Sequence, residues 1–182
     1  MVIKLESERL CIEPFTSDDA FRIKELANDK RLADILGLPH PYELKFAQDW
    51  IEVQPELIKL GVEYPLGIVS KESREIVGTI TLRIDKVNNR GELGYWIGQD
   101  YLGKGFATEA VNRMIHFGFT ELGLNKIWAS AISRNKSSTR VLEKCGLRKE
   151  GTLRQNRLLL DTYEDVDVYG LLKTEYTASA FK

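Results

Sequence analysis

The residues with the clearest chemical potential form a glycine-rich turn between a predicted strand and a predicted helix. The turn has the sequence Gly103-Lys104-Gly105-Phe106-Ala107-Thr108. Its two glycines allow the backbone to bend so that successive N–H groups point at one spot, and the following helix adds the positive end of its dipole. Such a turn is suited to binding phosphate. From the glycines alone, an ordinary tight turn before a helix is an equally good interpretation.

Two nucleotide-binding fingerprints do not fit this turn. A Gly-x-Gly-x-x-Gly pattern would need glycine where Thr108 stands, and a P-loop would need Gly-Lys-Ser/Thr after four spacer residues. The two cysteines, Cys11 and Cys145, cannot build a disulfide framework and match no metal-ligand spacing. We therefore expect an anion site without a metal.

Further motifs occur in order along nearly the whole chain. They are Glu8-Arg9-Leu10, Pro39-His40-Pro41-Tyr42, Glu92-Leu93-Gly94-Tyr95-Trp96-Ile97, the glycine-rich turn, Asn135-Lys136-Ser137-Ser138 and Leu142-Glu143-Lys144-Cys145-Gly146-Leu147. Together they resemble the GNAT superfamily of N-acetyltransferases, and most closely its RimJ/RimL-like branch, the ribosomal-protein N-terminal acetyltransferases.

The resemblance implies an activity and a set of contacts. The implied activity is direct transfer of an acetyl group from acetyl-CoA to a primary amine in a ternary complex. In such enzymes the turn holds the pyrophosphate, the preceding strand offers backbone groups to the pantetheine arm, and an Asn-x-x-Ser motif lies near the thiol. The residues expected to bind coenzyme A are Gly94, Tyr95, Trp96, Ile97, Gly103, Lys104, Gly105, Phe106, Ala107, Thr108, Asn135 and Ser138.

The sequence departs from the family where the leaving thiolate is protonated. Leu142 stands where many members have a tyrosine that acts as the acid. We therefore expect Ser138 to protonate the thiolate, and its alternative role is helix capping. Glu92 is the candidate base, because it shares a strand face with Gly94 and Trp96. Its alternative role is to pair with a neighbouring arginine or to cap a buried backbone group. Tyr95 and Trp96 are expected to be wall and core.

Other residues bear on the acceptor and on charge. The loop Pro39–Tyr42, with Phe46 and Trp50, either lines the acceptor pocket or packs under the sheet. Arg157 stands where some RimL-like proteins have an acidic residue, so their base cannot be carried over. Residues 133–157 hold eight Lys or Arg and two Glu, a local charge of +6 that is either a solvated face or a flank for an anionic cofactor.

The elements that must position these residues form one mixed α/β domain over residues 1–182. The expected fold is a mostly antiparallel central sheet flanked by helices, in the order βααβββαβαββ. We predict strands at 2–14, 66–69, 76–84, 91–97 and 126–132 and two after 147. The predicted helices are at 20–27 (with caps and first-turn acids at 16–19), 46–57 (kinked or restarted by Pro55), 107–122 and 137–144.

Composition limits the class of protein. The chain has 182 residues, 43% of them hydrophobic, and 26 Lys and Arg against 27 Asp and Glu leave a net charge of −1. This balance argues against a protein that coats nucleic acid. No apolar run approaches the roughly 18 residues of a transmembrane helix, and the N-terminus does not look like a signal peptide. We expect a cytoplasmic protein, with a homodimer possible.

Three functions stay open at this point. The first is acetylation of the α-amine of a protein or peptide, most of all a ribosomal one. The second is the same chemistry on a small amine such as a polyamine, an amino acid or an antibiotic. The third is a non-catalytic acyl-CoA-binding module, because the usual tyrosine acid is missing.

Overall fold

The structure is a computed structural model that describes residues 3–177. These residues form one eight-stranded sheet in the order β1-β2-β3-β4-β5-β6-β8-β7, in which β5 and β6 alone run parallel. The strands are β1 (Leu5–Glu6), β2 (Leu10–Glu13), β3 (Glu63–Ser70), β4 (Ile76–Asp85), β5 (Arg90–Ile97), β6 (Lys126–Ile132), β7 (Arg148–Leu159) and β8 (Thr162–Leu172). The expected mixed, mostly antiparallel sheet flanked by helices is confirmed.

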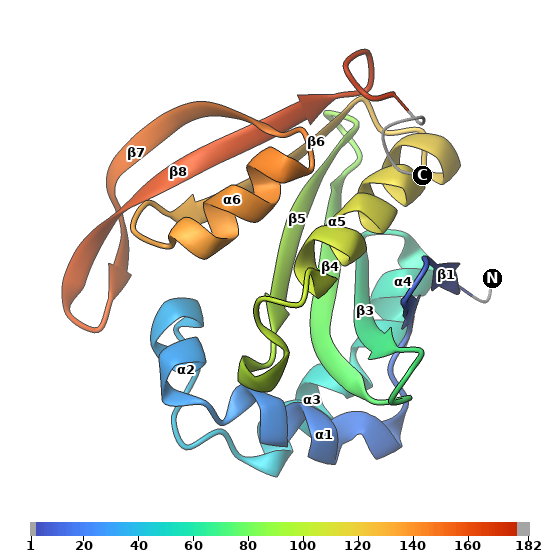
Figure 1. Ribbon diagram of the computed structural model, residues 1–182, viewed down its shortest axis with the longest axis vertical. Coiled ribbons are helices and arrows are strands. Elements are labelled where there is room, and N and C mark those ends of the chain that lie inside the picture. The colour runs from blue at the N-terminus through green and yellow to red at the C-terminus, as the bar shows by residue number, and fades with distance from the viewer. Residues whose placement is uncertain (1–2, 178–182) are drawn as a thin grey trace.

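Helices cover both faces of this sheet. They are α1 (Ala20–Ala27), α2 (Lys30–Leu36), α3 (Leu44–Glu52), α4 (Gln54–Leu60), α5 (Phe106–His116) and α6 (Lys136–Lys144), with short 3-10 helices at Ser17–Asp19 and Gln99–Tyr101 and a π-helical turn at Phe117–Glu121. In Figure 1, α5 and α6 cross the near face of the sheet, while α1 and α3 gather at its lower end. None of the helices in residues 3–177 is long and apolar enough to cross a bilayer.

Side-chain alternation on the strands produces two separate cores. Ile80, Leu82 and Leu93 are buried on the face that packs against α5. The residues between them on β4, Thr79 and Thr81, point to the opposite face, where α1 and α3 form a smaller core around Ile23 and Ala47. Successive strand residues face opposite ways, so β5 presents a different set of side chains to each side.

The prediction of one continuous N-terminal strand was wrong. The segment is a hairpin of β1 and β2, and its turn is held by Glu109 of α5, which accepts hydrogen bonds from Ser7 Oγ and the Arg9 backbone N–H, both at 2.7 Å. These residues are about 100 positions apart in the sequence, so the local alternation of apolar and polar residues could not predict their contact. Residue 2, the first of the predicted strand, lies outside the described residues.

The prediction of two helices before residue 60 was also incomplete. The first is followed by a separate helix, α2, capped by Asp29 Oδ1, which accepts from the Leu32 N–H at 3.0 Å, and ended by Gly37 at a φ of 72°. Asp29 and Gly37 are ordinary cap signals, and they could have been recognised in the sequence. The predicted restart at Pro55 is confirmed, since α4 begins at Gln54.

The sheet opens between β5 and β6. These two strands pair only where Arg90 to Glu92 face Lys126 to Trp128, whereas the pairing of β5 with β4 continues to Ile97. From Leu93 onward β5 therefore has an edge that β6 does not cover. Figure 1 shows the two strands diverging, with α5 and α6 on either side of the opening.

Candidate active site

A cleft of about 450 Å³ lies at this opening. It runs from the end of β5, past the glycine-rich turn and the start of α5, to α6 and α2. Of the residues predicted to bind coenzyme A, ten line it: Tyr95, Trp96, Ile97, Gly103, Gly105, Phe106, Ala107, Thr108, Asn135 and Ser138. Lys104 lies in the turn without lining the cleft, and Gly94 faces the other side of β5.

The turn has the backbone geometry that an anion site needs. Gly103 and Gly105 have φ angles of 75° and 81°, in the left-handed region that glycine adopts most readily, and Gly105 is the N-cap of α5. Arg9, in the turn between β1 and β2, fixes the glycine-rich turn, because its Nη1 donates to the Lys104 carbonyl oxygen at 2.9 Å while its Nε pairs with Glu109 at 2.7 Å. The first N–H groups of α5 have no partner within the helix and can serve a bound anion.

Basic side chains add to this site from two helices. Arg31 of α2 and Arg140 and Lys144 of α6 line the cleft, and all three are exposed. The predicted basic block of residues 133–157 is thereby divided. Two of its members face the cleft, while Arg134 and Arg148 form surface ion pairs elsewhere.

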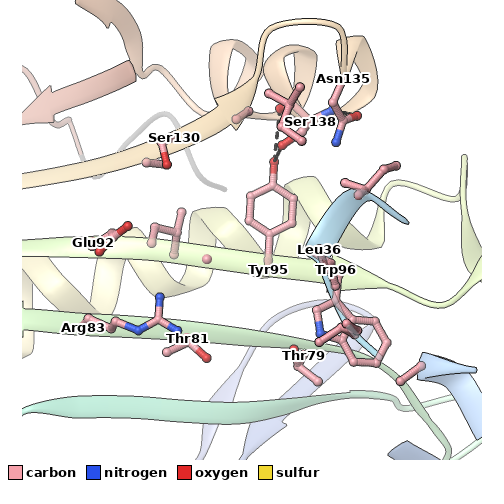
Figure 2. Close-up of a pocket in the computed structure, with 18 of the residues that line it drawn as sticks. Leu36, Thr79, Thr81, Arg83, Glu92, Tyr95, Trp96, Ser130, Asn135 and Ser138 are labelled. Carbon is pink, nitrogen blue, oxygen red and sulfur yellow. Dashed lines mark hydrogen bonds between the residues drawn. The ribbon is translucent and has the colours of Figure 1, made fainter. Parts of the chain in front are cut away.

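A tyrosine from β5 meets a serine from α6 at the inner end of the cleft. The Tyr95 hydroxyl donates to the Ser138 carbonyl oxygen at 3.1 Å and shares a hydrogen bond with Ser138 Oγ, also at 3.1 Å (Figure 2). Burial raises the pKa of Tyr95 to about 12, although the contact with Ser138 acts the other way. The expectation that Tyr95 is only a wall residue missed this contact, because it depends on how α6 sits over β5.

Ser138 does not cap its helix. The N-cap of α6 is Asn135, whose Oδ1 accepts from the Ser138 N–H at 3.3 Å and from Ser137 Oγ at 2.8 Å. The Ser138 hydroxyl is therefore left for Tyr95 and for whatever occupies the cleft. This removes the alternative role that the sequence allowed for Ser138.

A second cavity, of about 410 Å³, lies on the opposite side of β5. It shares Tyr95, Trp96, Asn135 and Ser138 with the first, so the two meet at the Tyr95–Ser138 contact. Figure 2 shows Glu92, Arg83 and Thr81 side by side on the strands that line it.

Glu92 stands in this second cavity without a protein partner. Within residues 3–177 its carboxylate makes no ion pair and no side-chain hydrogen bond, and it is half-buried. The alternative that Glu92 pairs with a neighbouring arginine is therefore not found. Arg83, its cross-strand neighbour on β4, pairs instead with Glu63, at 3.1 Å between Nε and Oε1.

The β7–β8 hairpin and α2 meet over the second cavity. Arg157 of β7 donates from Nη2 to the Leu36 carbonyl oxygen at 2.7 Å, and both residues line the cavity. Tyr42 and Trp50 line it as well, whereas Phe46 is exposed and packs edge-on against the Tyr42 ring. His40 is exposed and does not line it.

The cysteines do not contribute a nucleophile. Cys145 is buried, its Sγ lies 3.5 Å from the Thr108 carbonyl oxygen, and burial raises the pKa of its thiol to about 12. Burial, aided by Glu13, also raises the pKa of Cys11 to about 11. Both thiols therefore stay protonated at neutral pH. Among the described residues, no cluster of His, Cys, Asp or Glu could hold a metal ion.

The geometry is suited to transfer between two bound molecules without a covalent enzyme intermediate. One cleft offers an anion site and an open strand edge, the other offers a free carboxylate, and a serine hydroxyl lies at their border. Residues 9–148 match the family model described as "Acetyltransferase (GNAT) domain". This chain belongs to the GNAT acetyltransferase family. The resemblance seen in the sequence is thereby confirmed, and the protein is an N-acetyltransferase.

Two relatives of this chain are named as acetyltransferases. It is 34% identical over 173 residues to the N-acetyltransferase p20 of Bacillus licheniformis, covering 94% of this chain and 97% of that one. It is 31% identical over 96 residues to the ribosomal-protein-serine acetyltransferase of Escherichia coli, 52% of this chain and 54% of that one, in keeping with the RimJ/RimL-like branch.

Among solved structures, spermidine N-acetyltransferase from Vibrio cholerae, in complex with CoA and spermine, superposes with a TM-score of 0.81. The sequence identity is 24%, and the match covers 93% of this chain and 99% of that one. This likeness shows the fold.

Proposed function

We propose that this GNAT enzyme transfers the acetyl group of acetyl-CoA directly to the α-amine of a protein or peptide, with ribosomal proteins as the first candidates. The observation that carries the proposal is that two cavities approach β5 from opposite sides and meet at Tyr95 and Ser138. One cavity takes the acetyl donor and the other takes the amine. Holding two reactants in line in this way can supply up to about 7–11 kcal/mol of the barrier.

Acetyl-CoA suits the cleft beside α5. When bound, it supplies an acetyl thioester and several phosphate groups. The N–H groups at the start of α5 would hold the pyrophosphate, and Arg31, Arg140 and Lys144, which line the cleft, would add positive charge for the phosphates. The open edge of β5 beyond Glu92 offers backbone hydrogen bonds to the amide groups of the pantetheine arm, much as a sheet edge accepts another strand.

Two side chains carry the proton transfers. Glu92 accepts a proton from the amine in the second cavity, where no cation among residues 3–177 pairs with its carboxylate. As the amine nitrogen bonds to the acetyl carbon and the C–S bond breaks, Ser138 donates a proton to the leaving sulfur and is reprotonated from solvent, with Tyr95 holding its hydroxyl in place. An α-amine has a pKa of about 7.7–8.0 against about 10.4 for lysine, so a single weak base suffices near neutral pH. A single domain over residues 1–182, a cytoplasmic location and a homodimer stay predictions.

An acceptor panel tests the proposal. The purified protein is incubated with acetyl-CoA and one acceptor at a time, and release of the free thiol is measured. Each peptide is used with a free N-terminus and with a blocked N-terminus that leaves an internal lysine, and spermidine completes the panel. We expect release with free N-termini only. Release with spermidine alone would favour the small-amine function, and calorimetric binding of CoA with no turnover on any amine would favour a non-catalytic module.

A further inference from the structure

We propose that the second cavity, which takes the acceptor, selects amines that carry an anionic group on the same residue as the amine. The guanidinium of Arg83 is the group that determines this specificity. A peptide with N-terminal Asp or Glu has this chemistry, and so does a free amino acid. The inference rests on the proposed function, because it assigns the second cavity to the amine.

Arg83 lies on the strand face that lines the second cavity, and its guanidinium points into this cavity. Arg83 and Glu92 are directly opposite each other in the antiparallel pair β4–β5, so their side chains project from the same face. The Arg83 Nη1 lies 3.8 Å from the point that a Cβ on Gly94 would occupy. The guanidinium therefore leans over β5 into the cavity. Because Gly94 has no side chain, nothing on that residue stands between the guanidinium and a bound molecule.

The terminal nitrogens of Arg83 can still donate hydrogen bonds to a ligand. Its ion pair with Glu63 has 3.1 Å between Nε and Oε1, and within residues 3–177 its two terminal nitrogens have no hydrogen-bond partner. Guanidinium and carboxylate favour two-point contacts, which the free Nη groups can offer to a ligand. The opposite charges of Arg83 and Glu92 do not form an ion pair with each other in this part of the chain, so each is available to a different group of one acceptor.

The charge of the side chains that line the cavity also favours an acceptor with an anionic group. Its charged lining side chains are Glu92, Arg83 and Arg157, a net charge of +1. A polyamine brings several positive charges and would face two guanidiniums with one carboxylate. An acceptor with one amine and one nearby anionic group would match Glu92 and Arg83 together. Charge complementarity of this kind sets specificity between substrates of similar size.

Matched acceptors test the inference. At saturating acetyl-CoA, kcat/KM is measured for two peptides that differ only in N-terminal Asp or Asn, and for free aspartate against its diamide. In the pair of acceptors that the enzyme acetylates, we expect kcat/KM to be about tenfold higher for the acid than for the amide. This is the low end for a charge-assisted hydrogen bond, because Arg83 is half-exposed. Preference in the peptide pair indicates a peptide acceptor. Preference only in the free pair indicates a small molecule, and would contradict the peptide part of the proposed function while supporting this inference.

Variants connect the preference to one side chain. In Arg83→Gln the ratio of acid to amide should fall to about 1, and Arg83→Lys should restore part of it. Glu63→Gln is the matched control, because it removes the same ion pair but keeps the guanidinium, and it should keep the wild-type ratio. A wild-type ratio below about 2 in both pairs, or a ratio unchanged in Arg83→Gln, would overturn the inference.

A binding measurement separates this inference from the proposed function. The N-acetylated Asp and Asn peptides are titrated into the CoA-loaded protein by calorimetry, which requires no turnover. Tighter binding of the Asp peptide that disappears in Arg83→Gln would support the inference even if no amine were acetylated. Equal binding of the two peptides, or binding of neither, would overturn it even if acetylation of other amines were found.

Discussion

The Tyr95 hydroxyl lies 3.1 Å from both oxygens of Ser138, so β5 and α6 are joined by hydrogen bonds at the border between the donor cleft and the acceptor cavity. We propose that this pair, contributed by two different elements, takes the place of the tyrosine acid that many family members have at the position of Leu142. Leu142 itself is fully buried in the core. In the proposed mechanism the serine donates the proton, and the tyrosine holds its hydroxyl in place.

The first prediction concerns this pair. Ser138→Ala should lower kcat by about 100-fold, the low end of the range for one general acid. Tyr95→Phe should lower it less, because it leaves Ser138 without its positioning partner, and should cost about 1 kcal/mol of stability through the lost hydrogen bond. The double variant should be no slower than Ser138→Ala alone, since the two residues act as one unit. Tyr163→Phe, at an exposed position on β8, is the control, and additive losses would contradict the pairing.

The second prediction concerns the base. Glu92→Gln should lower kcat/KM by about a hundredfold, the low end for a general base, while the calorimetric Kd for CoA stays within about twofold because Glu92 lies on the acceptor side of β5. The measurement is thiol release at saturating acetyl-CoA, beside a CoA titration. An unchanged kcat/KM would remove Glu92 from the mechanism.

The third prediction concerns the glycine-rich turn. Gly105→Ala places a Cβ at a φ of 81° and 3.2 Å from Arg9 Nη2, so it should strain the turn and weaken CoA binding by about tenfold. Gly123→Ala imposes a similar backbone strain, at a φ of 69°, with no atom within 4 Å of the new Cβ. It should lower stability without changing the Kd for CoA. Equal effects of both variants on CoA binding would show that the turn has no special role.

The fourth prediction concerns the contact between Arg157 of β7 and Leu36 of α2 over the second cavity. Arg157→Ala removes the 2.7 Å hydrogen bond to the Leu36 carbonyl oxygen, and it should raise the KM for the acceptor several-fold while the Kd for CoA is unchanged. Arg154→Ala, an exposed arginine on the same strand, is the matched control. Because both arginines are exposed, neither change should alter stability by more than about 0.5 kcal/mol. A rise in KM of the same size in both variants would indicate a general charge effect.

The fifth prediction concerns pH. Asp167 is buried, which opposes ionisation, but Lys149 at 2.8 Å and the hydroxyls of Thr152 and Ser133 outweigh this and lower the pKa of its carboxyl to about 2. An aspartate in the unfolded chain has a pKa near 3.9. The depressed folded value means that the stabilisation is complete above about pH 4 and is lost as pH falls toward 2.

The Asp167→Asn variant measures this contribution. Its free energy of unfolding in urea should be lower than that of the wild type at pH 7, and the difference should shrink by pH 3 and below. Asp161→Asn, in the exposed turn between β7 and β8, should leave the curve of stability against pH unchanged. A wild-type and an Asp167→Asn curve that stay parallel down to pH 2 would contradict the prediction.

Much of the fold could be predicted because its signals are local. The period-two pattern of the three strands from residue 63 to 97 and the apolar stripe of α5 are set by neighbouring residues. The glycines at 103 and 105 predicted a turn, and the structure places both at positive φ. The helix α2 was missed although Asp29 and Gly37 marked its ends, because its seven residues are too few for a clear stripe.

The amino-acid sequence by itself determined most of the strands and helices, and which segment could bind an anion. Tertiary structure alone decided that Tyr95 reaches Ser138, that Arg83 leans over Gly94, and that Arg157 closes on Leu36. Each of these contacts depends on strand register or on the docking of a distant element. Register and docking are set by burial summed over many residues, so the sequence near any one side chain does not specify its partner.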